Sequence, residues 1–310
     1  MTEIDNASTI RGRATRRTLL TAAAGAAALL PTGASGASAA PPRAGAPRAA
    51  AFGRLRALER RHGARLGAVA RNTVTGATVL YRADERFPMC STFKTLAAAA
   101  VLRDLDRHGE VLAKRIRYTA ADIVENSDTC EQHLATGMTV AELCDAAIRF
   151  SDNTAANLLL RELGGPTAVT RFCRSLGDTA TRLDRWEPEL NTAEPWRIED
   201  TTTPAAIAGT YERLVLGDAL NRGDRERLTG WLLGNTTSTH RFREGLPEDW
   251  RLADKTGGGS YGTNNDVGIA WTPEGTPVVL AVLTTKPERD APSDNLLVAR
   301  AATVLASAVT

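Results

Sequence analysis

The spacing of apolar and polar residues predicts helices through the middle of the chain and strands near both ends. Segments with apolar residues at helical spacing are residues 52–62, 91 to about 108, 140–148, 153–163, 204–215, 225–233 and a last helix from 295. Short apolar segments bounded by turn residues are 65–71, 78–81, 252–256, 267–271 and 278–284. Short hairpin-like turns, as at Thr75-Gly76, favour antiparallel pairing of these strands. The pattern therefore predicts an α+β (mixed α/β) fold, in which both ends build one sheet around an all-helical insertion.

One long segment shows no clear period. Residues 183–204 are polar and carry Pro188, Pro195 and Pro204. This composition and length are typical of a compact Ω-loop with functional side chains. We predict an α/β sheet domain from residues 45–82 plus 233–310, and an all-α domain from residues 83–232 that includes the loop.

The first 40 residues are predicted to lie outside the fold. A stretch with Arg16-Arg17 precedes an Ala/Leu-rich run through Leu30, and small residues follow up to Ala37-Ser38-Ala39. This order describes an export signal, and the paired arginines indicate the twin-arginine route. A membrane anchor is the alternative, but the run is shorter than the roughly 20 apolar residues that span a bilayer. We therefore expect an exported protein, periplasmic or extracellular.

Charge and histidine spacing argue against several classes of partner. The first 39 residues hold four of the 38 Lys and Arg residues and two of the 36 Asp and Glu residues, so the remainder carries 34 of each. A basic face for nucleic acid or membrane lipid is therefore not indicated. The four histidines show no paired ligand spacing, so we expect no metal site and no cofactor.

Cysteine and lysine usage bear on the chemistry. Cys90, Cys130, Cys144 and Cys173 allow three pairings, but we expect four free, mostly buried thiols that act as small hydrophobes.

Only four of the basic residues are lysines, and they are Lys94, Lys114, Lys255 and Lys286. Arginine does not release a proton, whereas lysine does when burial or nearby cations lower its pKa. Two of these lysines lie in the motifs described next, which indicates sites that need a titrating amine.

Four short motifs with reactive side chains follow one another along the chain. They are Ser91-Thr-Phe-Lys94, Ser151-Asp-Asn153, Glu187-Pro-Glu-Leu-Asn191 and Lys255-Thr-Gly257. They supply a hydroxyl nucleophile, two amines, a second hydroxyl that relays protons, and a carboxylate beside an amide. This inventory suffices to acylate a serine and to release the acyl group to water. Each motif alone is common, and only the ordered set makes coincidence improbable.

The first motif pairs the nucleophile with a base. Ser91 begins a predicted helix, where the helix dipole supplies positive potential. Lys94 lies one turn further on the same face, so a neutral Lys94 is a candidate acceptor for the Ser91 proton. Without the other motifs, Ser91 would be interpreted as a helix N-cap.

The motif set resembles that of class A serine β-lactamases and penicillin-binding proteins, and the Glu187 motif makes the chain similar to the class A branch. The resemblance covers roughly residues 45–310. It implies a five-stranded antiparallel sheet flanked by helices, with an inserted all-α lobe. It also implies a hydrolase that opens the β-lactam amide through a Ser91 acyl-enzyme, and hence antibiotic resistance.

The resemblance implies roles for the residues around the nucleophile. Ser151 would carry a proton to the departing ring nitrogen, and Asn153 would bind both Lys94 and the amide of the substrate's side chain. Asp152 is expected to be structural. The backbone N–H groups of Ser91 and Gly258 are the candidates for an oxyanion hole.

By the same resemblance, the fourth motif would bind the substrate carboxylate and the third would activate water. Lys255 and Thr256 would bind the carboxylate, and Gly257 is a further substrate-binding candidate, because glycine lets a ligand approach the backbone closely. Relatives often carry an arginine where this chain has Asn264, and Arg241 stands where other members supply the guanidinium, so Arg241 is assigned to this contact.

Glu187 would activate the water that Asn191 fixes. Arg185 and Asp200 are expected to pair at the base of the loop, and the Glu187-Pro188 bond is a candidate for the cis form of many relatives. Whether Lys94 or Glu187 activates Ser91 stays open. Asn126 replaces an aromatic residue of many relatives, which leaves the preferred β-lactam class open.

Other classes share part of this motif set. A D-alanyl-D-alanine peptidase of the penicillin-binding group usually lacks the water site of Glu187 and Asn191. A β-lactam sensor domain stays acylated and is normally joined to a membrane segment. A serine-dependent glutaminase is a more distant alternative. We expect a monomeric β-lactamase whose partner is the small-molecule β-lactam substrate.

Overall fold

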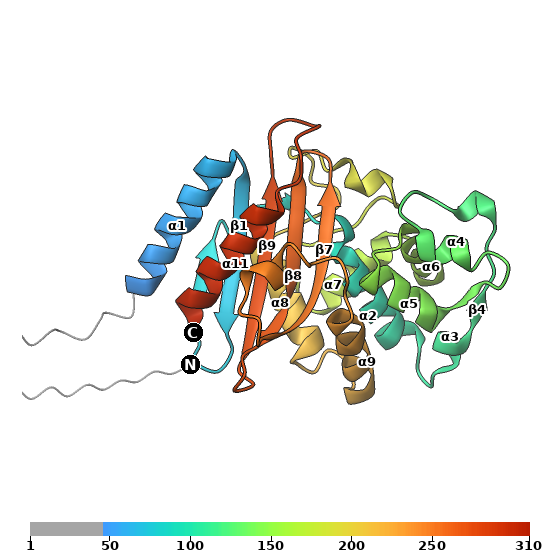
Figure 1. The fold of residues 1–310 in the computed structure, drawn as a ribbon. Helices are drawn as coiled ribbons and strands as arrows, with labels where there is room; N and C mark the ends of the chain where they lie inside the picture. The colour runs from blue at the N-terminus through green and yellow to red at the C-terminus, as the bar shows by residue number, and fades with distance from the viewer. Residues whose placement is uncertain (1–45) are drawn as a thin grey trace, which may run out of the picture. The chain divides into compact units, whose positions relative to one another are not determined.

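Five strands from the two ends of the chain form the central sheet of the computed structural model, which describes residues 46–310 (Figure 1). In spatial order they are β2 (Thr78–Tyr81), β1 (Arg65–Asn72), β9 (Pro277–Thr285), β8 (Thr263–Trp271) and β7 (Arg251–Gly259). All four pairings are antiparallel. The predicted α+β fold with a five-stranded antiparallel sheet is therefore confirmed, while the predicted export signal lies outside the described residues.

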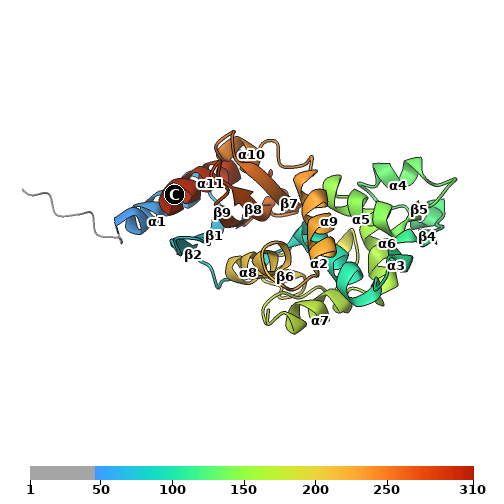
Figure 2. The ribbon, with the colours of Figure 1, turned by 90° about the horizontal axis from the view of Figure 1, so that it is seen from below.

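Helices cover both faces of this sheet (Figure 2). Helices α1 (Ala46–His62) and α11 (Asn295–Val309) pack on one face, and α8 (Pro204–Val215) packs against β1, β8 and β9 on the other. Successive β9 residues therefore alternate between two hydrophobic cores. Val278, Leu280 and Val282 face the core of α1 and α11, and Val279, Ala281 and Leu283 face the other. Burial on both faces explains why the sequence of β9 is a continuous apolar run.

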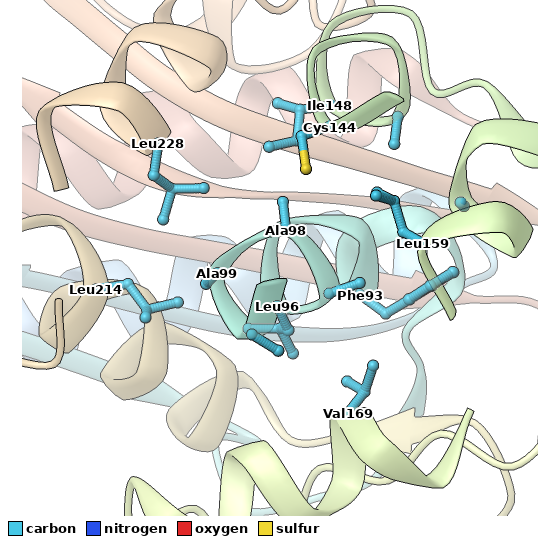
Figure 3. Packing of buried hydrophobic residues seen from close by; sticks show 14 of the residues in the cluster. Phe93, Leu96, Ala98, Ala99, Cys144, Ile148, Leu159, Val169, Leu214 and Leu228 are labelled. Carbon is cyan, nitrogen blue, oxygen red and sulfur yellow. The ribbon is translucent and has the colours of Figure 1, made fainter. Parts of the chain in front are cut away.

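Helix α2 (Phe93–Ala100) is the centre of the helical part of the molecule. All eight of its residues are buried, and its alanines let neighbouring helices approach closely. The surrounding helices are α5 (Val140–Arg149), α6 (Asn153–Leu163), α7 (Thr167–Ser175) and α9 (Arg222–Leu233). Figure 3 shows Leu159, Val169 and Leu228 directed at α2 from different sides. The segment that follows Ser91 is therefore held on all sides by the core.

The helix predicted from Ser91 to about His108 is shorter in the structure. Ser91 lies in a single 3₁₀ turn, Cys90–Thr92, and the helix ends as a π-helical turn at Val101–Leu105. Asp106 is extended, and its carboxylate accepts hydrogen bonds from the N–H groups of residues 111 and 112. The side chain thus stabilises the start of the next helix, and the preceding helix ends at Leu105, three residues before its predicted end near His108.

The remaining elements are short and have no detectable period in the sequence. They are helices α3 (Glu110–Ala113), α4 (Asp128–Gln132) and α10 (Phe242–Gly245), the 3₁₀ turn Ala120–Asp122, and strands β3 (Phe87–Pro88), β6 (Thr201–Thr202), β4 (Arg115–Ile116) and β5 (Met138–Thr139). Strand β3 pairs with β6, and β4 pairs with β5.

The polar segment 183–204 is irregular except for β6 and a 3₁₀ turn at Glu189–Thr192. The peptide bond between Glu187 and Pro188 is cis. The described residues lie within one compact unit, and the division into a sheet domain and an all-α domain stays a prediction. Helix α8 lies in the predicted all-α segment and yet packs on the sheet, so the two parts share a core.

Two further findings concern cysteines and membranes. All four cysteines lie in the described part of the chain, where they are free and buried, as expected. Across residues 46–310, no helix has the length and apolar character needed to cross a membrane.

Candidate active site

Ser91 is fixed at the start of α2 and faces a carboxylate. The hydroxyl of Tyr211 donates to the carbonyl oxygen of Thr92 (2.9 Å), which ties the Ser91 turn to α8. Ser91 Oγ donates to Oε1 of Glu187 at 3.4 Å. The Ser91 side chain caps no backbone N–H of its helix, so its interpretation as a simple N-cap is wrong.

Lys94 is fully buried among polar partners. Its Nζ donates to the carbonyl oxygen of Ser151 (2.7 Å) and to Oδ1 of Asn153 (2.6 Å), and it lies 3.1 Å from Oε1 of Glu187. Burial lowers the pKa of Lys94, while the negative charge of Glu187 opposes that shift. Within the described residues no hydrogen bond joins Lys94 to Ser91, and the same oxygen of Glu187 contacts both.

Ser151 accepts hydrogen bonds from both motif lysines. Its Oγ accepts from Nζ of Lys255 (3.1 Å) and from Nζ of Lys94 (3.3 Å). Ser151 adopts a left-handed φ of +60°, which is uncommon for a residue other than glycine. The Nδ2 group of Asn126 donates to its carbonyl oxygen (3.0 Å) and helps to hold this conformation. The adjacent Asp152 is structural, because its carboxylate caps the N-terminus of α6.

Lys255 is buried on β7 in a positively charged environment. Burial, followed by repulsion from Lys94 and Arg241, holds the pKa of Lys255 well below its usual range. Its Nζ donates to Ser151 Oγ and to the carbonyl oxygen of Thr256 (2.8 Å). The hydroxyl of Thr256 lies 2.5 Å from that of Thr237. The hydroxyl groups of Thr237 and Thr256 therefore lie near Lys255 and line the same cavity as Arg241.

Glu187 is held by two asparagines and is only 2% exposed. Asn191 Nδ2 donates to Oε2 of Glu187 at 2.5 Å. Asn157 on α6 accepts from the Glu187 N–H (3.0 Å) and donates to its carbonyl oxygen (2.8 Å). The carboxylate is therefore fixed between Ser91 on one side and the Asn191 amide on the other.

An ion pair closes the base of the Glu187 loop. Nε of Arg185 lies 2.5 Å from Oδ2 of Asp200, a residue that is 1% exposed. The other oxygen of Asp200 accepts the N–H groups of Asp184 (2.8 Å) and Arg185 (3.0 Å). The pairing that the resemblance implied is therefore present.

Strand β7 passes so close to the Ser91 turn that side chains would not fit. A Cβ at Gly257 would lie 2.8 Å from the carbonyl oxygen of Met89, and one at Gly259 would lie 2.6 Å from that of Asn191. Gly258, between them, lines the same cavity as Ser91. The two proposed oxyanion N–H donors thus belong to residues on one cavity.

This cavity has a volume of about 420 Å³ and gathers residues from all four motifs. Its lining residues are Ser91, Glu125, Asn126, Phe150, Ser151, Asn153, Asn191, Thr237, Arg241, Thr256, Gly257, Gly258, Gly259 and Ser260. Lys94, Glu187 and Lys255 are buried behind this surface, and their functional atoms contact Ser91 or Ser151.

Arg241 lines this cavity, whereas Asn264 does not. The guanidinium of Arg241 donates to the carbonyl oxygens of Gly257 (3.2 Å) and Asn265 (2.9 Å), which fixes it beside β7. Asn264 is fully buried and donates to Asn295 (3.0 Å). The guanidinium at the cavity therefore comes from Arg241 and not from the position of Asn264, as the resemblance predicted.

The sequence did not identify several residues of the site. Asn157 had a signal, because it lies one turn after Asn153 and is a polar residue on a buried apolar helix face. Thr237, Glu125 and Phe150 had none, because their positions depend on how loops pass the cavity. Within residues 46–310, no group of three or more His, Cys, Asp or Glu residues is arranged to hold a metal ion.

Comparison with known proteins agrees with the family that the four motifs resemble. The model of the Beta-lactamase enzyme family matches residues 51–309. A β-lactamase of Streptomyces lavendulae is 64% identical over 308 residues, which cover 97% of this chain and 99% of that protein. The solved β-lactamase of Streptomyces albus G has a TM-score of 0.81 and 62% identity, covering 84% of this chain and all (100%) of that chain. A solved variant of the last common ancestor of Gram-negative class A β-lactamases has a TM-score of 0.81 at 52% identity, covering 84% and 98%.

Proposed function

Because the chain belongs to the serine β-lactamase family and hydrolyses β-lactams, we propose that hydrolysis runs through a covalent acyl-enzyme on Ser91. One observation carries this proposal. The buried Glu187 carboxylate hydrogen-bonds to the Ser91 hydroxyl through one oxygen (3.4 Å) and to the Asn191 amide through the other (2.5 Å). A single base thus stands between a nucleophile and a group able to hold water.

Acylation begins when Ser91 Oγ attacks the β-lactam carbonyl carbon and its proton passes to Glu187, the side chain to which it is hydrogen-bonded. Lys94 stabilises the carboxylate from 3.1 Å. The N–H groups of Ser91 and Gly258 stabilise the developing oxyanion, and the loss of one such donor costs about 2.7–4 kcal/mol of barrier.

The C–N bond of the ring then breaks, and the ring nitrogen takes a proton from Ser151. Lys255 and Lys94 both donate to Ser151 Oγ, so its lone pairs are occupied by amines and its own proton is directed to the nitrogen. Proton transfer from a positioned group typically contributes about 100- to 10,000-fold in rate. Lys94 restores the proton on Ser151 and takes in its place the proton that Glu187 received from Ser91, so Glu187 is a carboxylate again before deacylation.

Substrate binding uses the two ends of the cavity. The carboxylate is bound by Thr256, by Lys255 and by the Arg241 guanidinium on the same cavity. At the other end Asn153 binds the amide of the acylamino side chain, and Gly257 lines the cavity with backbone atoms alone.

Deacylation regenerates the enzyme. A water held by Asn191 loses a proton to Glu187 as it attacks the ester carbon, the ester C–O bond breaks, and Ser91 Oγ regains its proton. This step separates a hydrolase from a β-lactam sensor, which stays acylated. It also separates the chain from a D-alanyl-D-alanine peptidase, which usually lacks this water site.

Glu187→Ala tests the assignment, with intact-mass spectrometry after mixing with a penicillin as the measurement. Removal of Glu187 also removes the charge that keeps the pKa of Lys94 from falling further, so Lys94 becomes neutral more readily and takes over acylation. We expect a stable adduct on Ser91 in this variant, turnover in the unaltered chain, and no adduct in Ser91→Ala. A variant that turns over normally, or forms no adduct, contradicts the role given to Glu187.

We further propose that residues 1–40 export the enzyme by the twin-arginine route to the periplasm or the medium, where it acts as a monomer and confers antibiotic resistance. The supporting feature is the order of Arg16-Arg17, apolar run and Ala37-Ser38-Ala39. Replacement of both arginines by lysine is expected to retain activity inside the cell. Undiminished export of that variant would contradict the route, and a dimer in size-exclusion chromatography would contradict the oligomeric state.

A further inference from the structure

A second cavity, of about 410 Å³, adjoins the active-site cavity on the side of Ser151. It shares two wall residues with it, Asn126 and Phe150. Its other lining residues are polar and are Asp128, Thr129, Gln132, Asp152 and Thr236. The two hollows therefore border the same two side chains, and a substrate group that passes Phe150 would enter the second one.

Phe150 is exposed where most phenylalanines of the chain are buried. It follows the last residue of α5 and is 43% exposed, whereas Phe93 and Phe172 on neighbouring helices are buried. The Arg149 guanidinium lies 5.1 Å from the centroid of its ring, within the range of a cation–π contact. Arg149 is itself tied to Asp145 at 3.3 Å. The ring is therefore supported from one side, while it borders both cavities.

The other shared wall, Asn126, is occupied by a different task. Its Nδ2 donates to the carbonyl oxygen of Ser151 (3.0 Å), and its own carbonyl oxygen accepts from the N–H of Asn153 (3.0 Å). Asn126 also adopts a left-handed φ of +59°. It thus holds the loop that carries Ser151, and the apolar contact surface between the cavities belongs to Phe150.

The proposed binding mode determines which part of a substrate reaches Phe150. The ring nitrogen meets Ser151, and the carboxylate on the adjoining ring meets Thr256, whose hydroxyl lies 2.5 Å from that of Thr237. Phe150 directly precedes Ser151 in the sequence, and Thr236 directly precedes Thr237. Both Phe150 and Thr236 line the second cavity. The acylamino side chain meets Asn153 instead. A substituent on the carboxylate-bearing ring therefore points towards Phe150.

We propose that Phe150 is a specificity-determining residue that packs against flat substituents on the carboxylate-bearing ring and directs them into the second cavity. This inference rests on the proposed function. A planar aromatic contact adds affinity beyond the buried area, and concave sites with an aromatic wall and a few polar groups are typical ligand sites. The polar lining beyond the ring suits a heteroaromatic group better than an alkyl chain.

The test compares two cephalosporins with the same acylamino side chain. One carries a methyl group on the carboxylate-bearing ring, and the other carries a heteroaromatic ring on a methylene. The measured quantity is kcat/KM, which reports substrate binding through acylation. The enzymes are the unaltered chain, Phe150→Ala, Phe150→Leu and Phe150→Tyr. Phe52→Ala is the matched control, because Phe52 has the same exposed fraction of 43% and lies on α1 outside both cavities.

We expect Phe150→Ala and Phe150→Leu to lower kcat/KM for the heteroaromatic substrate by about three- to tenfold, which corresponds to a typical aromatic contact. The methyl substrate is expected to change less than twofold, Phe150→Tyr to restore the preference, and the control to match the unaltered chain. Equal losses for both substrates would give Phe150 a structural role and overturn the proposal, as would no loss for either. If the unaltered chain forms no acyl-enzyme with either substrate, the proposed function fails instead.

Discussion

Asn157 is expected to control catalysis through Glu187 without a contact of its own to substrate. Its side chain makes two hydrogen bonds to the backbone of Glu187, at 2.8 and 3.0 Å. Both residues are buried, with exposed fractions of 8% and 2%. Asn157→Ala therefore leaves one N–H and one carbonyl oxygen of the Glu187 backbone without their partner.

The magnitude follows from these two contacts. A buried polar group that loses its partner costs about 1–3 kcal/mol, so two groups lower the free energy of unfolding by about 2–6 kcal/mol. The same change releases the loop from α6. Because small misplacements of a catalytic group cost about 100-fold in rate, we expect deacylation to slow by about that factor. Acylation is expected to slow less, since Lys94 is able to replace Glu187 as the base.

Two measurements check this reasoning: urea denaturation for stability, and rapid-quench mass spectrometry for the rates of formation and decay of the Ser91 adduct. Asn221→Ala is the control, because Asn221 caps α9 outside the cavity and its loss costs about 1 kcal/mol. This control is expected to lose stability without accumulating adduct. If Asn157→Ala is destabilised but deacylates at the normal rate, Asn157 does not aim Glu187 and the reasoning is refuted.

Two further predictions concern charge on β7 and β8. Since the pKa of Lys255 is lowered by burial, Lys94 and Arg241, the amine loses its charge as pH rises towards its usual pKa, and KM for carboxylate-bearing substrates should rise over that range. In Lys255→Arg the charge persists, so KM should stay flat with pH, and an unchanged alkaline rise would assign the titration to another group. Burial and the neighbouring Asp254 raise the pKa of Asp266 well above its usual range, which favours a neutral carboxyl. Asp266→Asn should therefore change the free energy of unfolding by less than about 1 kcal/mol, whereas Asp266→Ala, which leaves the N–H of Phe242 unpaired (now bonded at 3.1 Å), should cost about 2–3 kcal/mol in urea denaturation. Equal effects of the two Asp266 variants would contradict a neutral carboxyl.

Local spacing made the central residues of the site predictable. Ser91 and Lys94 stand three apart, so their proximity follows from helical geometry. The strands were predictable because their apolar runs are long: predicted 65–71 became β1 at Arg65–Asn72, and predicted 278–284 became β9 at Pro277–Thr285. The helix predicted from 225 instead begins at Arg222. Asn221 caps it through the N–H of Asp224 (3.0 Å), and the intervening glycine hides this cap from a propensity argument.

Residues that depend on the path of a loop were not predictable. Thr237 meets Thr256 only because the segment after α9 passes along β7, and nothing near Thr237 in the sequence indicates it. Phe150 follows an apolar helix face and by composition belongs to the core, yet it is exposed at the rim of the site. Tertiary contacts decide where the last side chain of a helix or strand points. The hydrophobic period and the motif spacing therefore do not predict its direction.

The buried acid pair on β7 and β8 explains how the site keeps its attraction for a carboxylate. Asp254 and Asp266 are both fully buried, and burial raises the pKa of each. Two ionised carboxylates at this depth would repel each other and would also offset the positive charges of Lys255 and Arg241. Because like charges in a buried site do not both ionise, one proton remains on the pair. The pair therefore supplies enough negative charge to tolerate two buried cations, while it leaves net positive potential where the substrate carboxylate binds.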